Sequence, residues 1–196
     1  WLGSEAGNAI ADVLFGDYNP SAKLAMTFPR SVGQIPIYYS HFNTGRPATN
    51  DANRNYNSSY NDESVFPKYE FGYGLSYTSF QYSNLQMSKK KLKANEQIEV
   101  AVTITNTGKY DGEEIVQLYL RDKVGSIVRP MKELKDFQKI NLKAGETRTI
   151  KFIINKEKLS FFNQQLQWVA EPGDFELMIG ASSKDIRLKD NFELIK

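Results

Sequence analysis

The stretch that decides the fold is Ile98-Glu99-Val100-Ala101-Val102-Thr103-Ile104-Thr105-Asn106-Thr107-Gly108. Every second side chain from Ile98 to Ile104 is aliphatic and β-branched, which is the period of a strand that buries one face. The Asn-Thr-Gly segment that follows is rich in turn-forming residues. These residues therefore predict a β-strand that ends in a turn near residue 106.

The same kind of pattern recurs toward the C-terminus. Apolar or alternating segments cover residues 114–120, 134–140, 147–154, 161–169 and 175–179. Turn signals separate several of them, at 143–146 and at 171–174. Short strands at this spacing indicate a β-sandwich, and the absence of a cysteine pair favours the fibronectin type III variety over an immunoglobulin domain. We place this sandwich at residues 84–196, which makes the fold mainly β.

The N-terminal segment has a different pattern. Residues 4–15 predict a helix, with Ser4 as N-cap and Gly16 as the C-terminal glycine, and residues 24–28 predict a short buried strand. One αβ unit cannot close a hydrophobic core by itself. We therefore expect residues 1–40 to be the last part of an α/β sandwich domain, whose other elements lie upstream. The start at Trp1, without a Met or a basic leader, fits that expectation.

Residues 41–83 connect the two patterns and are irregular. They are rich in Asn, Ser and Tyr, and the stretch from Asn50 to Asp62 is almost wholly polar. Disordered segments are poor in aromatic residues, so we expect an ordered strap that lies across two domains. We expect 50–62 to be its most mobile part. The aromatic side chains suit docking better than contact with a glycan, although both remain open.

Composition excludes several functions. The net charge of +2 indicates neither nucleic-acid nor membrane-surface binding, and no apolar run reaches the ~20 residues that span a bilayer. The chain has no cysteine and a single histidine, His41, so a zinc site is not expected. The series Asp51, Asn53, Asn55 and Asn57 resembles a calcium loop only faintly, because it lacks the central glycine and the closing glutamate. We expect no metal and no organic cofactor.

Specific motifs then point to a family. They are Gly3-Ser4-Glu5-Ala6-Gly7 with its continuation to Leu24, Phe28-Pro29-Arg30-Ser31-Val32-Gly33-Gln34-Ile35-Pro36, Asn43-Thr44-Gly45-Arg46-Pro47, Tyr69-Glu70-Phe71-Gly72-Tyr73-Gly74 and Arg129-Pro130-Met131-Lys132-Glu133-Leu134. In this order they resemble the C-terminal part of family 3 glycoside hydrolases, most closely the bacterial periplasmic β-glucosidases. Ala6 and Ala22 stand where the family often has glycine, which puts only local turn geometry in doubt.

The resemblance implies a retaining, exo-acting β-glucosidase with upstream catalytic domains as partners and a periplasmic or secreted location. In such enzymes the nucleophilic Asp and the acid/base Glu lie in motifs that do not occur in this sequence, so no catalytic residue is expected here. Glu5 matches a glutamate of the family motif that is not the acid/base. Glu5, His41 and Arg46 are the residues that we expect nearest to substrate. The oligomeric state stays open, with a homodimer as one option.

A non-catalytic binding module is the alternative function. It would hold polysaccharide or a partner protein through aromatic side chains on the sandwich. Trp168, in the Gln-rich segment Asn163-Gln164-Gln165-Leu166-Gln167, is the residue to inspect. A buried core tryptophan is the favoured interpretation of Trp168, and a sugar-stacking platform is the other.

Overall fold

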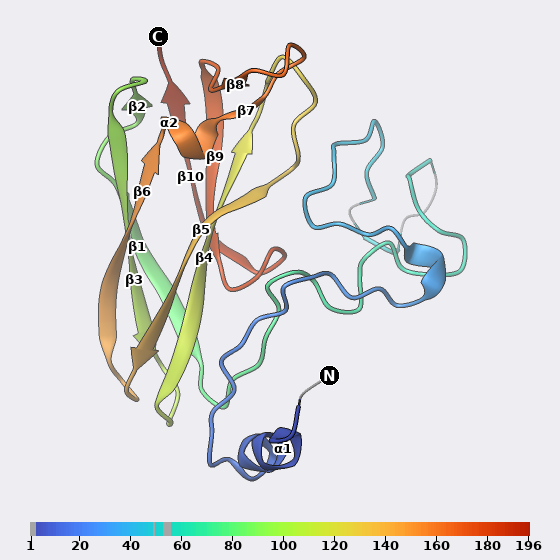
Figure 1. The fold of residues 1–196 in the computed structure, drawn as a ribbon, viewed down its shortest axis with the longest axis vertical. Helices are drawn as coiled ribbons and strands as arrows, with labels where there is room; N and C mark the ends of the chain where they lie inside the picture. The colour runs from blue at the N-terminus through green and yellow to red at the C-terminus, as the bar shows by residue number, and fades with distance from the viewer. Residues whose placement is uncertain (1–2, 49, 53–55) are drawn as a thin grey trace.

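Two β-sheets pack face to face in the computed structural model, which describes residues 3–48, 50–52 and 56–196 (Figure 1). The smaller sheet has the strand order β1-β3-β6, and all its pairs are antiparallel. Its strands are β1 (Phe80–Met87), β3 (Gln97–Asn106) and β6 (Thr147–Asn155). The predicted strand at 98–104 is therefore the central strand of this sheet.

The larger sheet has five strands in the order β2-β10-β9-β4-β5. Only β2 and β10 pair in parallel. The strands are β2 (Lys91–Leu92), β10 (Ile186–Leu194), β9 (Gly173–Gly180), β4 (Gly112–Asp122) and β5 (Glu133–Leu142). The mainly β sandwich is confirmed, and the segments predicted at 114–120, 134–140, 147–154 and 175–179 all lie in strands.

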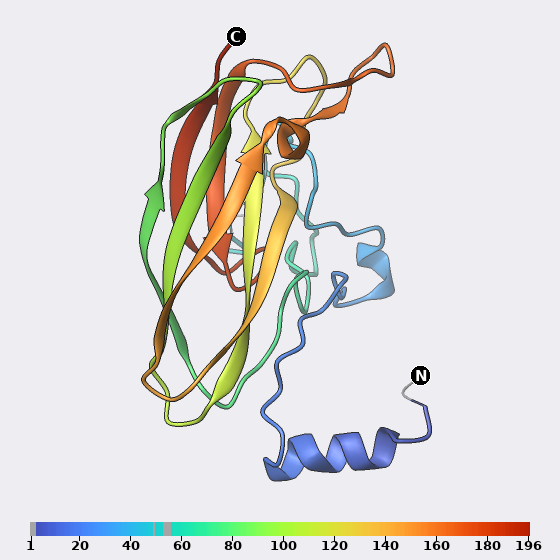
Figure 2. The ribbon, with the colours of Figure 1, turned by 60° about the vertical axis from the view of Figure 1, so that its left-hand side comes forward.

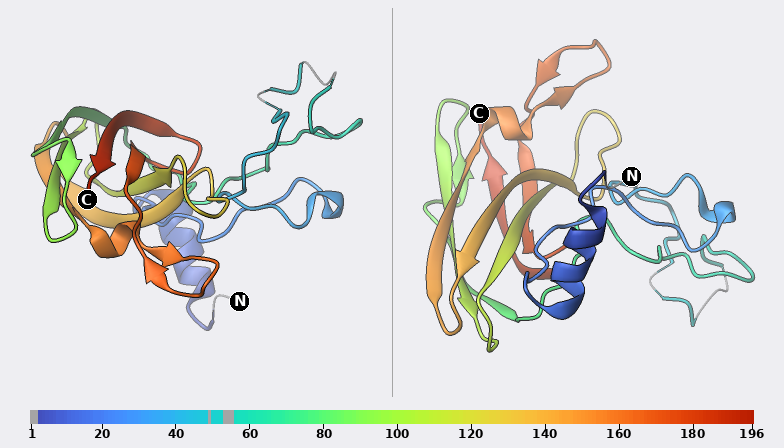
Figure 3. Two further views of the ribbon diagram at one scale, coloured as in Figure 1. Left: turned by 90° about the horizontal axis from the view of Figure 1, so that it is seen from above. Right: turned by 60° about the horizontal axis from the view of Figure 1, so that its bottom comes forward.

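The core lies between the sheets and follows from the alternation of β3. Ile98, Val100, Val102 and Ile104 are completely buried, and they face Val116, Leu118 and Leu120 of β4 within one apolar cluster. Burial of each such side chain stabilises the fold by about 1.5–3 kcal/mol relative to exposure. The view from above shows the two layers and the strap that leaves them sideways (Figure 3).

One predicted strand is wrong. Residues 161–169 form a small hairpin, with β7 (Phe161–Phe162) and β8 (Trp168–Val169) paired antiparallel. The Asn163 side chain accepts hydrogen bonds from the backbone N–H groups of Gln165 and Gln167, and Leu166 has a left-handed φ of 56°. These bonds reverse the chain where the apolar pattern alone suggests continuity. The short helix α2 (Lys156–Leu159) leads into the hairpin.

The predicted helix forms as α1 (Ala6–Phe15), and Gly16 ends it with a left-handed φ of 88°. The predicted cap is wrong, because Glu5 and not Ser4 occupies the N-cap position. A turn bond from the Ala6 N–H to the Gly3 carbonyl places Ser4 inside a turn before the helix. Figure 2 shows α1 projecting below the end of the sandwich.

The buried strand predicted at residues 24–28 is also wrong. The segment bends at Ala25 and Met26, and Phe28 is exposed. It pairs with the strap at Leu24 and at Phe28. The Leu24 N–H donates to the Tyr73 carbonyl (2.8 Å) and the Phe28 N–H to the Tyr69 carbonyl (2.8 Å), while the Leu24 and Phe28 carbonyls accept bonds from N–H groups of residues 68–72. An apolar run alone does not make a strand when no sheet lies beside it.

The rest of the N-terminal half has little regular structure. A 3-10 turn, η1 (Val32–Gln34), precedes the strap, and the buried Gln34 amide donates to the Ser64 carbonyl (2.7 Å). No helix in the described part of the chain has the length and apolar character needed to cross a membrane.

Candidate functional site: the strap against strand β4

The outer face of β4 is covered by the strap, residues 41–83. Strand alternation places Gln117 and Tyr119 on the side away from the core, yet their exposed fractions are 2% and 0%. The Gln117 amide donates to the Gly72 carbonyl (3.1 Å) and to the Ala181 carbonyl (2.7 Å). This strand is therefore buried on both faces, once by the core and once by the strap.

An aromatic stack fastens the strap at this place. The ring of Tyr39 stacks on Phe71 with centroids 4.2 Å apart and meets Tyr119 edge-on at 6.0 Å. The Leu134 N–H donates to the Tyr39 hydroxyl (3.2 Å), and the Tyr119 hydroxyl donates to Gln117 Oε1 (2.5 Å). Burial raises the pKa of Tyr119 far above its usual range, which keeps this phenol a neutral donor.

Gly72 is required for this close approach. Its φ is +80°, and a Cβ at this position would lie 2.2 Å from Oε1 of Gln117. An L side chain would meet both the backbone strain and the clash. The glycine of the aromatic motif at 69–74 therefore has a steric role in docking.

A buried ion pair fastens the segment that precedes the strap. Lys23 Nζ donates to Glu114 Oε1 (3.1 Å), and the Tyr82 hydroxyl donates to the same oxygen (2.8 Å). Burial, and then the Glu114 charge and its hydrogen bond, raise the pKa of Tyr82. The Arg187 guanidinium lies over the Tyr82 ring at 5.1 Å. Glu114 on β4 thus joins the N-terminal segment to the sandwich.

Neighbouring contacts extend this junction. The Asn19 amide donates to the Asp111 carbonyl (2.9 Å), and its oxygen accepts from the Tyr77 N–H (2.9 Å). The Ser21 hydroxyl donates to Glu113 (3.0 Å). The turn after α1, the end of the strap and the start of β4 therefore form one connected joint.

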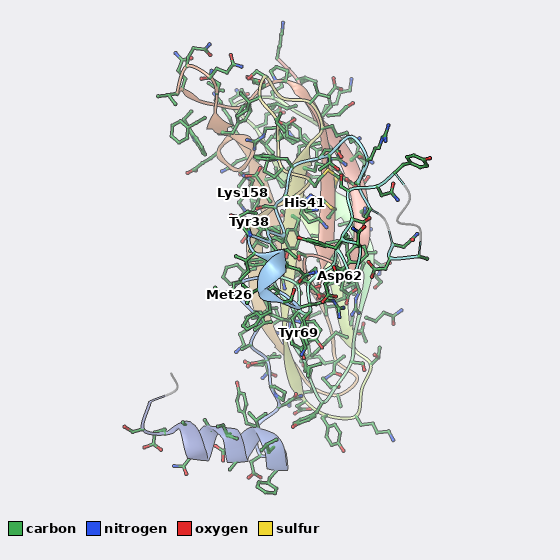
Figure 4. The ribbon with its side chains drawn as sticks, turned by 90° about the vertical axis from the view of Figure 1, so that its right-hand side faces the viewer. Met26, Tyr38, His41, Asp62, Tyr69 and Lys158 are labelled. Atoms are coloured by element: carbon green, nitrogen blue, oxygen red, sulfur yellow. The ribbon has the colours of Figure 1, made fainter. Side chains whose placement is uncertain are left out.

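A groove of about 390 Å³ opens between the strap and the loops of the larger sheet. Strap residues His41, Phe42 and Phe66 line one part, and Lys132 and Lys184 line the other. Lys132 Nζ donates to the Ser183 carbonyl (2.6 Å), and burial lowers the pKa of Lys132. Lys184 Nζ lies 4.6 Å from the centroid of the Phe66 ring. Figure 4 shows Tyr38, His41 and Tyr69 on this side of the sandwich, away from α1.

Comparison with known proteins gives this arrangement its family. The model of the Glycosyl hydrolase family 3 C-terminal domain matches residues 1–77, and that of the Fibronectin type III-like domain matches residues 114–183. The chain belongs to glycosyl hydrolase family 3. The joint at β4 is thus where these two parts of the family 3 chain meet.

Three relatives illustrate the similarity. The "Periplasmic beta-glucosidase" of Salmonella typhimurium is 51% identical over 195 residues, which cover 100% of this chain and 25% of that protein. A "Beta-xylosidase" of Formosa agariphila is 44% identical, over 96% of this chain and 25% of that protein. The structure of a β-glucosidase from Listeria innocua in complex with glucose superposes with a TM-score of 0.92 and 45% identity, over 99% of this chain and 27% of that one. The chain spans about a quarter of the length of these relatives.

The three residues expected nearest to substrate lie at separate places in this family 3 chain. Glu5 is exposed at the start of α1, where its carboxylate accepts from the Asn8 amide (2.8 Å). His41 is exposed in the strap, with its Nδ1 3.0 Å from the Phe42 carbonyl, and its own carbonyl accepts from the Met131 N–H. The Arg46 carbonyl accepts from the Ser58 N–H (2.8 Å). His41 and Arg46 share one segment, whereas Glu5 lies on another.

The faint calcium loop includes Asn53 and Asn55, which lie outside the described residues. Across 3–48, 50–52 and 56–196, the structure holds no cluster of three or more histidine and carboxylate side chains that could bind a metal. The Asp51 carboxylate instead accepts a hydrogen bond from the Ser64 hydroxyl (2.7 Å). The mobility expected for 50–62 stays a prediction.

Sequence reasoning missed Gln117 and Tyr39. The alternation of β4 places Gln117 on the solvent side, and Tyr39 is one of many aromatic residues in or next to the strap. The only local signal was the pair of glycines at 72 and 74 within an aromatic run, which indicates close backbone packing. That signal does not name the partner strand.

The favoured interpretation of Trp168 is wrong. Its side chain is 54% exposed and packs on Phe162, with ring centroids 4.9 Å apart. The reason is the hairpin, which carries β8 away from the space between the sheets (Figure 1).

Proposed function

We propose that this chain is the non-catalytic C-terminal part of a retaining, exo-acting β-glucosidase that removes terminal β-D-glucosyl residues. Residues 1–40 complete the second catalytic-region domain, 41–83 form the strap and 84–196 form the fibronectin-like domain. The names of the Salmonella and Listeria relatives support this activity, and the Salmonella name supports a periplasmic or secreted location. The Formosa relative keeps β-xylosides as a second substrate class to assay.

One observation carries the docking role. Residues 10–35 expose large apolar side chains although the same segment is fastened to β4 by its polar ones. These apolar residues are Ile10, Leu14, Phe15, Met26, Phe28, Val32 and Ile35. Exposed apolar surface of this extent marks an interaction site. Its occupant in this proposal is the catalytic region of the same protein, upstream of residue 1.

The catalytic pair is assigned to that upstream region. Retaining hydrolysis needs two carboxyl groups ~5–5.5 Å apart on either side of the scissile bond. Glu5, the carboxylate of the family motif, lies exposed at the start of α1, where it accepts a hydrogen bond from the Asn8 amide. The chain by itself is therefore inactive in this proposal.

The strap contributes to the surroundings of the substrate. His41 and Arg46 are exposed on the strap, on the side where the groove opens. In this proposal that side faces the catalytic region, and Glu5 reaches the same region from α1. Substitution His41→Ala or Arg46→Ala in the longer protein should then raise KM for an aryl β-glucoside more than it lowers kcat.

Removal of residues 84–196 from the longer protein tests the docking role directly. We expect a lower melting temperature and loss of aryl β-glucosidase activity, because the strap would lose the surface of β4. Unchanged stability and activity would disprove the docking role. Sedimentation of the longer protein without the deletion would show whether it is a homodimer.

A further inference from the structure

The hairpin at residues 161–169 presents an aromatic pair to solvent. Phe162 and Trp168 are cross-strand partners, with exposed fractions of 59% and 54% and a tilt of 56° between the rings. Leu166 at the tip is 81% exposed. Aromatic side chains gain much free energy when they are buried. A Trp and a Phe that pair on the surface therefore indicate a site that a ligand or a partner covers.

The hairpin itself carries no charged side chain, although the adjoining hollow is lined by Arg121, Asp122, Lys123 and Arg129. Charged residues make up 24% of the chain, yet the nine residues Phe161-Phe162-Asn163-Gln164-Gln165-Leu166-Gln167-Trp168-Val169 include none. Four of the nine are amides, which both donate and accept hydrogen bonds. An acidic peptide or a nucleic acid would need cations here. Amides beside an exposed indole complement a ligand with apolar ring faces and many hydroxyl groups.

The hairpin is also held rigidly. The Arg129 guanidinium stacks over the ring of Phe161 at 4.1 Å and donates to Glu133 (2.6 Å). In the loop before Arg129, the N–H and hydroxyl of Ser126 both donate to Glu171, at 2.8 and 2.6 Å. The start of the hairpin and the segment that follows it are thus both fixed to the loop 121–129. A platform fixed in advance loses little conformational entropy when a ligand binds.

A polar hollow of about 540 Å³ adjoins the hairpin. Gln164 lines it together with residues of the loop 121–129. Within it the Asp122 and Arg129 side chains are only 4% and 9% exposed, and Asp122 Oδ2 lies 3.6 Å from Arg129 Nε. These two atoms are shielded from solvent, so the ion pair forms part of the wall of the hollow and is not itself available to a ligand.

The position of the hairpin leaves it accessible. Figures 1 and 2 show β7 and β8 at the end of the sandwich opposite to α1. A catalytic region docked on α1 therefore leaves the hairpin open, whereas the adjoining hollow also borders the strap at Asn43.

From these features together we propose that the hairpin and the adjoining hollow bind a neutral β-linked glucan chain, with Trp168 as the stacking platform. This binding site adds to the docking function and does not depend on it.

The test is migration of the 196-residue chain in native gels that contain soluble mixed-linkage β-glucan. The gels are acidic, because a chain with a pI of about 8.6 then moves toward the cathode. We expect glucan to retard the wild-type chain. In Trp168→Ala the affinity for glucan should be about tenfold lower, which corresponds to about 1.4 kcal/mol. Trp168→Tyr, which keeps an aromatic face, and Tyr110→Ala, which removes another exposed aromatic ring, should be retarded like the wild type.

A second measurement covers the case in which Trp168→Ala does not fold. In a Trp1→Phe background, Trp168 is the only tryptophan, and its fluorescence should shift on titration with a β-glucan oligosaccharide. Three results overturn the proposal: no retardation of the wild type, equal retardation of a folded Trp168→Ala, or equal retardation by an anionic polysaccharide. A Trp168-dependent dimer without glucan binding would overturn it as well.

Discussion

Gln117 is a polar residue that the strand pattern predicts to be exposed but that the structure buries. In β4 it stands between Val116 and Leu118, on the side that alternation assigns to solvent, yet the strap buries it completely. Its amide remains satisfied because Gly72 and Ala181 supply carbonyl oxygens. A buried amide without these partners would cost about 1–3 kcal/mol, so strap and strand depend on each other.

Gly72→Ala should destabilise the chain by about 1–3 kcal/mol, because a Cβ at φ +80° would also collide with Gln117. Gly145→Ala is the matched control, since Gly145 has a similar φ of +78° with nothing within 4 Å of an added Cβ. We expect the control to lose only about 1 kcal/mol in urea unfolding. Equal losses would show that the close approach of Gly72 to Gln117 is not needed.

The buried phenols of Tyr82 and Tyr119 should make the free energy of unfolding fall at alkaline pH. Burial raises both phenol pKa values above the ordinary 10, with Glu114 adding to the shift at Tyr82 and Arg187 opposing it. Their contribution is complete below pH 10 and falls as pH rises, because the unfolded chain ionises first. Each tyrosine should add a slope of about 1.4 kcal/mol per pH unit above pH 10.

Urea unfolding from pH 9 to 11 checks this. Tyr82→Phe should reduce the slope, whereas Tyr110→Phe, at a side chain that is 63% exposed, should not. Burial lowers the pKa of Lys132, so below pH 10.5 this residue changes the stability with pH in the opposite sense. Its effect is the same in each variant and cancels when their slopes are compared. An unchanged slope in Tyr82→Phe would contradict the prediction.

At the scale of elements, β4 is the strand on which the architecture rests. It pairs with β5 and β9, faces β3 across the core, binds Lys23 through Glu114 on the core side and carries the strap on its outer face. Before β1 begins at Phe80, the described residues of the strap have almost no regular structure of their own. Their order therefore comes from side-chain contacts with β4, chiefly the Tyr39–Phe71 stack.

Tyr39→Ala should release the strap and leave the sandwich folded, because Tyr39 contacts the strap, Tyr119 and the Leu134 N–H at once. Hydrogen exchange should become faster in peptides around 68–74 and stay slow in β3. Loss of a large, packed aromatic side chain costs about 3–5 kcal/mol when it is fully buried. Tyr38→Ala, at a neighbouring side chain that is 63% exposed, is the control. Unchanged exchange at 68–74 would refute the prediction.

At the scale of the whole molecule, helix α1 does not pack into a hydrophobic core. None of its side chains is buried, and Leu14 and Phe15 are 71% and 84% exposed. The Tyr77 hydroxyl attaches it to the strap by donating to the Val13 carbonyl, and a local bond from the Tyr18 N–H to the Asp12 carbonyl closes its C-terminal end. Such a helix gains its stability from whatever covers its apolar side.

Leu14→Asp should therefore change the stability of this chain by less than about 0.5 kcal/mol, since surface positions tolerate substitution. In the longer protein the same change should lower the melting temperature by several degrees, because it would place a carboxylate in the proposed interface. Ala9→Asp, at another exposed position of the same helix, provides a charge control. Equal, small effects in both proteins would count against docking through α1.

The sequence by itself determined the sandwich, the family and the helix with its terminal glycine. These rest on local periodicity and on ordered motifs, which the chain carries wherever it is placed in space. It did not determine the second burial of β4, the bend at 24–28 or the outward turn of Trp168. Those depend on which surface a segment meets, and a pattern of period two cannot say that a strap will cover its polar side. Only the tertiary structure brings Gly72 to Gln117 and leaves Trp168 in solvent, because both outcomes arise from contacts between residues far apart in the chain.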